Sequence, residues 1–335
     1  MKYPLPRDFR VRFEDLRIVA RGLNRPECVL ALSDGHLVAA HGSAGYSIID
    51  TGGHVTHTLI DSGGSRRYVP NGIAVSKKGE VLFADLGAER GGVFSIGADG
   101  SLKPLVESID GAPLPPSNFV LEDDAGRLWF TVSTRLLPRT AAWSHQVADG
   151  FIAVADDQGV RIVADNLGYT NEIAFSPDGQ WVYVNETYNQ RTSRFALLPG
   201  ASLGPKEVLV NFEGADFPDG LTFDQHGGLW ITCIGSNRLV VLRPDDASLQ
   251  TVLEDTDHAY AEKLAERLRA NLLSQEDMRT AGRSRLGNIS SLAFGGPSRS
   301  TAYLGCLLDD CIRSFESPVP GLAPAHWNRS LTRNA

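Results

Sequence analysis

The sequence predicts an all-β protein, a six-bladed β-propeller with a helical insertion before its last blade. The first observation is a phrase that occurs six times, in which a polar residue precedes an aliphatic strand, a glycine turn and a second apolar strand. The second is the spacing of these copies, because repeats of about fifty residues with several short strands each are typical of radial architectures. The third is composition, since 42% hydrophobic residues can build a core and 34 glycines supply many tight turns.

The polar position of each copy carries a side chain that can offer oxygen to a ligand. In chain order these residues are Glu27, Asn71, Asn118, Asn171, Asp219 and Ser290. Equivalent positions of a propeller surround one axis, because each blade contributes its innermost strand to the central channel. We therefore expect two carboxylates and several amides to meet at one mouth of that channel.

Each copy supplies the elements of one blade in order. Its first strand is apolar, as at 73–75, 173–175 and 221–223, and a turn such as SPDG or DQHG leads into the second strand. The second strand carries an aromatic residue, which we expect to pack between blades. These aromatics are Phe83, Trp129, Trp181, Trp230 and Tyr303. Further strands at 92–96, 151–156 and 238–244 give four strands per blade.

The two ends of the chain are expected to close the ring. Residues 12–20 precede the first copy and can complete a sheet with a C-terminal strand near 311–315. Such closure removes the exposed edges of an open sheet. Because a single blade cannot bury its own faces, residues 1–335 are expected to form one domain.

The interval before the last copy contains a segment with a different pattern. Residues 257–281 lack Pro and Gly and place Leu264, Leu268 and Leu272 at helical spacing, which predicts an amphipathic helix. Three roles stay open for this helical insertion: a lid over the mouth, a contact between subunits, or packing on the outside of a blade.

Charge and targeting signals restrict the classes of partner. The net charge is −8 and no cluster of Lys and Arg stands out, so nucleic acid and anionic membranes are not expected partners. Residues 1–16 lack the apolar stretch of a signal peptide, and no segment approaches the roughly 18 apolar residues of a membrane span. We expect a cytoplasmic protein with a small-molecule substrate, and the sequence leaves its oligomeric state open.

Several sequence motifs of other site classes are absent. The cysteines Cys28, Cys233, Cys306 and Cys311 form no CxxC pair and no Cys/His zinc pattern, so buried reduced thiols are expected. No Gly-rich phosphate loop joins a strand to a helix, and no GxSxG elbow is present. Nucleotide binding and serine hydrolase chemistry therefore have no support.

A divalent cation suits the polar positions. Glu27, Asn171 and Asp219 offer oxygen ligands that favour Ca²⁺, with Mg²⁺ or Mn²⁺ also suited and Zn²⁺ or Fe²⁺ less so without His or Cys. Two facing carboxylates would otherwise repel, and one would take up a proton. Polar residues at strand starts also cap turns. Five acid or amide side chains in one repeat register favour the metal site over turn chemistry.

The same residues resemble a known family. The phrases RPECVL, PNGIAV, TNEIAFSPDG, FPDGLTFDQHGGLW and NISSLAFGGP are similar to those of the regucalcin (senescence marker protein), gluconolactonase and diisopropylfluorophosphatase-like propellers, over residues of about 15 to 325. The resemblance implies a six-bladed propeller with one divalent cation in its channel. By matching motifs it assigns the metal to Glu27, Asn171 and Asp219, and it assigns Asn118 to contact with metal or substrate.

The activity implied by the resemblance is lactone hydrolysis, which makes the chain a lactonase-like hydrolase acting on carboxylic ester bonds. A cation can polarise the lactone carbonyl and activate water. Asp219 is then the candidate base, while Asn118 and Asn71 would orient the substrate or stabilise the oxyanion. Three alternatives stay open: phosphotriester hydrolysis, a non-hydrolytic cyclisation or rearrangement, and a non-catalytic calcium-binding propeller.

Departures from the family pattern point to the substrate. Where sugar-lactone members show Arg-x-Asn-Asp-Gly, this chain has Pro116 and Phe119 around Asn118, which predicts a less hydroxylated substrate in contact with Phe119. Glu172 replaces the usual Gly after Asn171, and we expect it to face solvent or form a structural salt bridge.

The long loop 133–149 is a second source of substrate contacts, because long loops on rigid scaffolds often line sites. It carries Arg139 and three residues with candidate roles. Arg135 would bind a carboxylate, Trp143 would stack on a ring, and His145 would move a proton.

Overall fold

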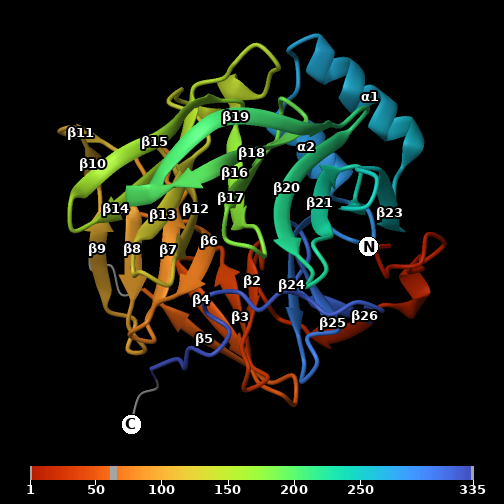
Figure 1. Cartoon of the computed structure of the whole chain (residues 1–335), viewed down its shortest axis with the longest axis horizontal. Coiled ribbons are helices and arrows are strands. Elements are labelled where there is room, and N and C mark those ends of the chain that lie inside the picture. Colours follow the sequence, from red (N-terminus) through yellow and green to blue (C-terminus); the bar gives the residue numbers. More distant parts are fainter. Residues whose placement is uncertain (1, 61–65, 333–335) are drawn as a thin grey trace.

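The computed structural model describes residues 2–60 and 66–332, and its strands form six four-stranded antiparallel sheets around a central channel (Figure 1). Each sheet is one blade, and the innermost strands are β2, β6, β12, β16, β20 and β24. The predicted six-bladed propeller is therefore confirmed.

The first three blades follow the chain from the first copy. Their strands are β2 (Val29–Ala31), β3 (Leu37–His41), β4 (Gly45–Ile49) and β5 (Val55–Leu59); β6 (Pro70–Val75), β7 (Val81–Asp85), β8 (Val93–Ile96) and β9 (Leu102–Val106); and β12 (Ser117–Glu122), β13 (Leu128–Val132), β14 (Gly150–Asp156) and β15 (Gly159–Leu167). A small hairpin, β10 (Ser108–Ile109) and β11 (Ala112–Pro113), joins the second blade to the third.

The last three blades complete the ring. Their strands are β16 (Thr170–Phe175), β17 (Trp181–Glu186), β18 (Arg191–Leu198) and β19 (Ser202–Asn211); β20 (Asp216–Phe223), β21 (Leu229–Gly235), β22 (Arg238–Leu242) and β23 (Leu249–Glu254); and β24 (Ile289–Gly295), β25 (Thr301–Cys306), β26 (Ile312–Glu316) and β1 (Arg17–Ala20). Three short 3-10 helices, η1 (Phe13–Asp15), η2 (Arg139–Ala142) and η3 (Pro199–Ala201), lie in connections.

The last blade is built from both ends of the chain. β1 pairs antiparallel with β26, with Arg17 opposite Ser314. This pairing confirms that the N-terminal segment completes the sheet of the C-terminal strand. It joins the N-terminal segment to the C-terminal strands in one sheet, which stabilises a ring whose blades are marginal on their own.

Aromatic residues of the second strands pack between blades as predicted: three of the five are fully buried, and Tyr303 of the sixth blade packs against the cluster that includes Ala31 and Ile49 of the first. Phe83, Trp129 and Trp230 have no exposed surface, and Trp129 packs edge-to-face on Phe175 of the next blade. Trp181 and Tyr303 are partly exposed. Burial of such large apolar side chains contributes about 1.5–3 kcal/mol each and makes them the main packing units of the ring.

The helical insertion consists of two helices rather than one. α1 (His258–Arg269) and α2 (Gln275–Ala281) are separated at Asn271, whose φ of 56° lies in the left-handed region. Ser274 then caps α2 in a reciprocal capping box with Asp277. Leu264 and Leu268 are buried as expected, whereas Leu272 falls in the break and is exposed.

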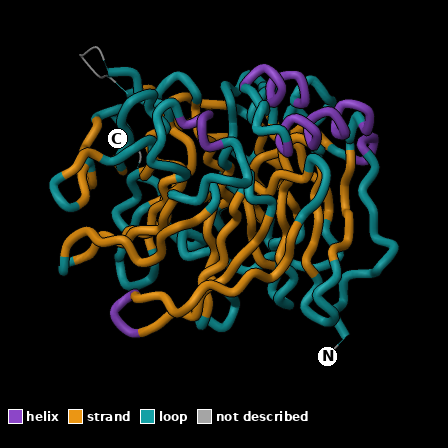
Figure 2. Tube along the Cα trace, turned by 90° about the horizontal axis from the view of Figure 1, so that it is seen from above, coloured by secondary structure: helices purple, strands orange, loops and turns teal. Residues whose placement is uncertain are grey.

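Both helices lie together at one end of the channel (Figure 2). Their buried residues join an aromatic cluster that includes Trp143, Tyr188 and Phe217. Of the three roles left open by the sequence, this placement favours a cover over the mouth. No helix among the described residues combines the length and the apolarity needed to cross a membrane.

The four cysteines are free and buried, as expected. Burial raises the pKa of the Cys28 and Cys233 thiols well above the usual range, which keeps them protonated and unreactive.

Candidate metal and substrate site

β-bulges set the direction of the polar side chains at the start of the inner strands. The pairing register shifts between Pro70 and Ile73 in β6, between Thr170 and Ile173 in β16, and between Pro218 and Leu221 in β20. Similar shifts occur at the start of β12 and β24. A bulge redirects the side chains near it. It therefore allows consecutive residues of one strand to reach the channel.

Two glycines at these bulges let neighbouring inner strands approach closely. A Cβ at Gly72 would lie 2.7 Å from Phe119 Cα, and one at Gly220 would lie 2.4 Å from the Ser290 carbonyl oxygen. Only glycine tolerates such contact. The PNG and PDG phrases thus bring Asn71 and Asp219 next to the following blade.

The three predicted metal ligands meet in one buried cavity of about 310 Å³. Glu27, Asn171 and Asp219 all line it, and each is at most 8% exposed. The amide nitrogen Asn171 Nδ2 donates to Asp219 Oδ1, and Glu27 forms an ion pair with Arg25. Residues from the first, fourth and fifth blades therefore share one site, although almost two hundred positions separate the first from the last.

Hydrogen bonds behind the site fix the orientation of Asn171. The Thr187 hydroxyl donates to the Pro218 carbonyl over 2.8 Å and accepts from Asn171 Nδ2 over 3.0 Å. The amide nitrogen is thus committed to protein acceptors, and the carbonyl oxygen Oδ1 stays available to a ligand. Asn185 in turn donates to the Asp219 carbonyl over 2.9 Å, which anchors the strand that carries the carboxylate.

Hydrogen bonds between blades continue around the channel at this level. Asn71 donates to the Asn118 carbonyl over 3.0 Å, Thr232 donates to the Ser290 carbonyl over 2.9 Å, and Ser290 donates to the Glu27 carbonyl over 2.7 Å. Each of these bonds joins one inner strand to the next blade. The polar repeat position therefore connects the ring as well as lining the site.

The two carboxylates of the site repel one another. Burial is the main cause that raises the pKa of Asp219 well above its usual range, and the negative charge of Glu27 adds to it. The hydrogen bond from Asn171 and the positive charges of Arg25 and Arg139 act in the opposite direction. A bound cation would relieve the repulsion.

Four of the predicted catalytic and substrate contacts line the same cavity. Asp219, Asn118, Asn71 and Trp143 are all at most 7% exposed and border it. Asn118 Oδ1 is buried without a hydrogen-bond partner among the described residues. Asn71 uses its nitrogen on the Asn118 carbonyl and accepts from Arg25 with its oxygen, so it positions its neighbours.

Three predicted substrate contacts lie elsewhere. Phe119 packs in the core and lines a second cavity of the channel, because the bulge at Asn118 separates the directions of the two side chains. Arg135 is exposed, pairs with Asp165 and stacks over Phe151. His145 is held by Gln190 over 3.1 Å and does not line the cavity.

The expectation for Glu172 was wrong. Its carboxylate forms no ion pair with any residue that the structure describes; it is partly buried inside the channel, accepts from the Leu221 backbone over 3.3 Å and lines the second cavity. Burial is the main cause that raises its pKa well above the usual range, followed by the charge of Asp219. Where two other copies carry Gly72 and Gly220, the fourth carries a side chain that enters the channel.

Two arginines that sequence reasoning left without a role complete the site. Arg25 pairs with Glu27, and Arg139 lines the cavity from η2 and donates to the Tyr169 hydroxyl over 2.7 Å. Apolar residues from several blades and from the insertion form the remaining walls. They are Leu86, Tyr188, Ile234, Met278, Leu307 and Leu308.

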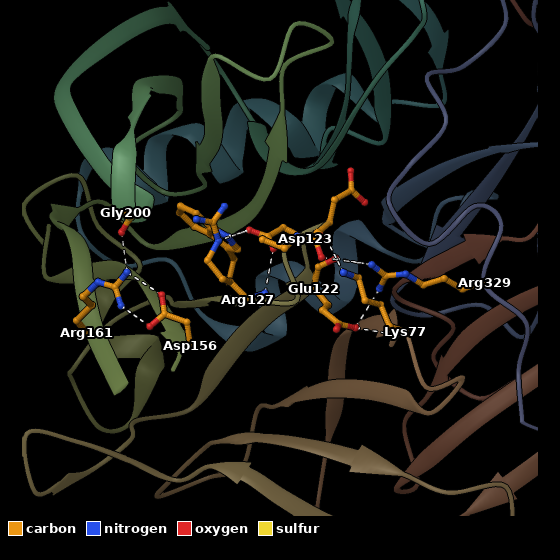
Figure 3. Close-up of polar contacts among 11 residues, drawn as sticks. Lys77, Glu122, Asp123, Arg127, Asp156, Arg161, Gly200 and Arg329 are labelled. Carbon is orange, nitrogen blue, oxygen red and sulfur yellow. Dashed lines mark hydrogen bonds and ion pairs between the residues drawn. The ribbon is translucent and has the colours of Figure 1, made fainter. Parts of the chain in front are cut away.

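The second cavity, of about 760 Å³, occupies the opposite end of the channel. All six inner strands line it with mainly apolar side chains, and the C-terminal segment 322–329 borders it. Charged residues hold its rim, where Arg127 binds Asp123 and Arg329 binds Glu122 (Figure 3). The two cavities therefore differ in the residues that the inner strands contribute, since the polar repeat positions line the smaller one and the apolar runs line the larger one.

Comparison with known proteins gives a consistent picture. Residues 19–258 match the family described as the SMP-30/Gluconolactonase/LRE-like region. A 6-deoxy-6-sulfogluconolactonase of Pseudomonas putida is 28% identical over 168 residues, which are 49% of this chain and 55% of that protein. The match to the curated relatives thus spans little more than half of their length.

Solved structures show the same architecture. A gluconolactonase from Xanthomonas campestris superposes with a TM-score of 0.65 at 18% identity, over 92% of this chain and 89% of that chain. A calcium-binding protein, regucalcin, from Agrobacterium tumefaciens superposes with a TM-score of 0.67 at 16% identity, over 97% and 99%. At these identities the likeness establishes the fold alone.

Proposed function

The chain belongs to the SMP-30/gluconolactonase/LRE-like family, and from this premise we propose that it is a lactone-opening hydrolase that works with one divalent cation, Ca²⁺ being the first candidate. The observation that carries the proposal is the meeting of two carboxylates and one amide in a single buried cavity. The names of relatives support it, since they include lactonases and a sulfogluconolactonase.

The donor set fits a hard cation. Glu27 and Asp219 provide two negative charges in a site where the charge of Glu27 disfavours the ionised form of Asp219, and Asn171 adds an amide oxygen. Asn118 Oδ1, buried without a hydrogen-bond partner among the described residues, is a fourth oxygen. When bound, the cation would polarise the lactone carbonyl and make water more acidic.

The side chains of the chain supply the proton transfers. Asp219 accepts a proton from the attacking water while the water oxygen bonds to the carbonyl carbon. The ring C–O bond then breaks, and the proton passes from Asp219 to the leaving alkoxide, which gives a hydroxy acid. The Asn118 amide nitrogen donates to the carbonyl oxygen as negative charge develops on it.

The walls of the cavity favour a substrate with few hydroxyl groups. Trp143 and Tyr188 pack in a tilted arrangement with ring centroids 5.0 Å apart, and Ile234 and Met278 face the same space. Apolar walls gain little from hydroxyl groups, which lose their water there without a partner. We therefore propose an aromatic or alkyl lactone rather than a sugar lactone.

A lactone panel tests this function. The protein is treated with chelator, assayed on gluconolactone and on apolar lactones, and assayed again after each of Ca²⁺, Mg²⁺, Mn²⁺ and Zn²⁺ is added. We expect turnover only with cation and a preference for the apolar lactones. Asp219→Asn should lower kcat by about 10²–10⁴-fold, the usual contribution of a positioned base, without unfolding the protein.

Other results would contradict the proposal. Cation binding without turnover on any lactone would indicate a non-catalytic calcium-binding propeller. Full activity of Asp219→Asn would remove that residue as the base, and a strong preference for gluconolactone would contradict the apolar substrate.

A further inference from the structure

Arg139 is a half-buried cation without an anionic partner in the described part of the chain. Its guanidinium donates to the Tyr169 hydroxyl, and no ion pair joins it to any carboxylate in the described part of the chain. Half-buried arginines elsewhere do have such partners, as Arg191 has Glu186 and Arg238 has Asp216. A buried charge that lacks its counter-charge is costly, because the interior replaces little of its hydration.

The environment of Arg139 is an aromatic pocket that opens on the cavity. Trp143, Tyr169 and Tyr188 are each at most 7% exposed, and the Tyr169 and Tyr188 ring centroids lie 4.7 Å apart. All three residues line the same 310 Å³ space as Arg139. The hydrogen bond to Tyr169 fixes one nitrogen of the guanidinium and leaves donors on the others.

The acids of the site do not account for Arg139. Glu27 already pairs with Arg25, and Asp219 accepts from Asn171. Arg139 acts on both acids only through its longer-range charge. The free donors of the guanidinium therefore face a cavity that can hold a ligand, and their planar arrangement matches the two oxygens of a carboxylate.

We propose that the substrate is an anionic lactone, a small apolar ring that bears a carboxylate held by Arg139 beside Trp143 and Tyr188. This inference rests on the proposed lactonase function. A cavity of about 310 Å³ suits such a compact ligand. Binding the carboxylate at Arg139 places one end of the ligand in the aromatic pocket and leaves the lactone ring in the part of the cavity that Glu27, Asn171 and Asp219 line.

The test compares a γ-lactone that carries a carboxylate with its primary amide, which has the same shape and no charge. Wild type should turn over the carboxylate with a kcat/KM at least about 10²-fold higher. Arg139→Gln should remove about 10²-fold for the carboxylate and change the amide by less than about threefold. Tyr169→Phe should raise KM for the carboxylate alone, because it loosens the guanidinium.

Arg283→Gln is the control. Arg283 follows α2 and is not among the residues that line the cavity, and its side chain is 70% exposed and pairs with Glu276. Removing its charge should leave both substrates within about threefold of wild type. Thermal unfolding of each variant checks that the protein is folded.

Binding separates this inference from the function on which it rests. A ring-ether carboxylate that cannot be hydrolysed is titrated into wild type and Arg139→Gln by calorimetry. Arg139-dependent binding without turnover of any lactone would support the anion site and contradict the lactonase. Equal loss on both lactones in Arg139→Gln, or no preference in wild type, would overturn the anionic substrate while the lactonase stands. Weaker cation binding as the sole effect of Arg139→Gln would overturn it as well.

Discussion

The two ends of the channel are built from the same six inner strands, but different kinds of side chain line the cavity at each end. The smaller cavity collects carboxylates, amides and arginines under the two helices, whereas the larger one is mainly apolar and bordered by the C-terminal segment. The difference begins at the bulges. The polar repeat residues lie at the bulges themselves. Beyond the bulges, the strands carry apolar runs such as Ile73–Val75 and Ile173–Phe175.

In this propeller, the polar residues of the site and the apolar residues of the core occupy different parts of the same inner strands. The two site carboxylates, Glu27 and Asp219, lie at the polar repeat position near the start of their inner strands, and bonds between blades connect the strands at this level. The rest of each strand stabilises the ring by burying apolar area. Glu172 is the exception, because it lies beyond the polar position and enters the apolar cavity.

The largest expected effect distinguishes the two carboxylates on either side of that boundary. Glu27→Gln removes a proposed cation ligand and the partner of Arg25, so kcat/KM should fall by about 10³-fold and cation affinity should fall with it. Glu172→Gln alters a carboxyl group that faces the other cavity and whose pKa is raised by burial, so activity should stay within about threefold. Steady-state kinetics and calcium titration measure both.

Equal losses in the two variants would contradict the separation and indicate one continuous site along the channel. Unfolding curves of both variants must be recorded, because the loss of the Arg25 partner also affects stability.

The next effect concerns the C-terminal segment under the larger cavity. Arg329 donates to the Val75 carbonyl over 2.7 Å and to Glu122 Oε2 over 3.1 Å (Figure 3). Arg329→Ala leaves these mostly buried acceptors without that donor, and the free energy of unfolding should fall by about 2 kcal/mol. Urea unfolding measures the loss, and kcat/KM should not change.

Arg12→Ala is the control for this prediction, since Arg12 is 75% exposed and pairs with Asp15 at the surface. It should cost less than about 0.5 kcal/mol. A loss of activity in Arg329→Ala that exceeds its effect on folding would show that the two ends of the channel communicate.

The sequence was sufficient for the parts of the molecule that repeat. The inner strands, the closure by residues before the first copy, and the shared register of Glu27, Asn171 and Asp219 all follow from a period that is visible six times. A repeat is informative because the residue type at one position can be compared across all six copies.

The parts that occur once were harder to predict. Arg139 reaches the cavity through the fold of one long loop. The direction of the Glu172 side chain depends on a bulge for which the sequence contains no characteristic residue. The break in the helical insertion did have a signal, since Ser274 and Asp277 stand three residues apart as in a capping box. Such features are decided by tertiary contacts rather than by local pattern.

The smallest effect compares two aspartates at opposite ends of the channel. Burial alone would raise the pKa of Asp123, but hydrogen bonds from Trp129 and from Arg127 outweigh it and lower the pKa, the reverse of Asp219. Ionised Asp123 therefore contributes stability above the unfolded pKa of about 3.9, and this contribution is lost as pH falls through the folded pKa. Asp123→Asn should cost about 1 kcal/mol at pH 7, a modest value because solvent screens the turn.

The difference between wild type and Asp123→Asn should then shrink as pH falls below about 3.9, since both side chains become neutral. Urea unfolding at pH 7 and at pH 3 measures it. Asp124→Asn is the control, because its exposed neighbouring carboxylate should give little difference at either pH. A constant difference across this range would mean that the shape of the side chain at position 123 matters and its charge does not. The hydrogen bond to Trp129 would then hold the turn at this end of the channel without the electrostatic support that the lowered pKa indicates.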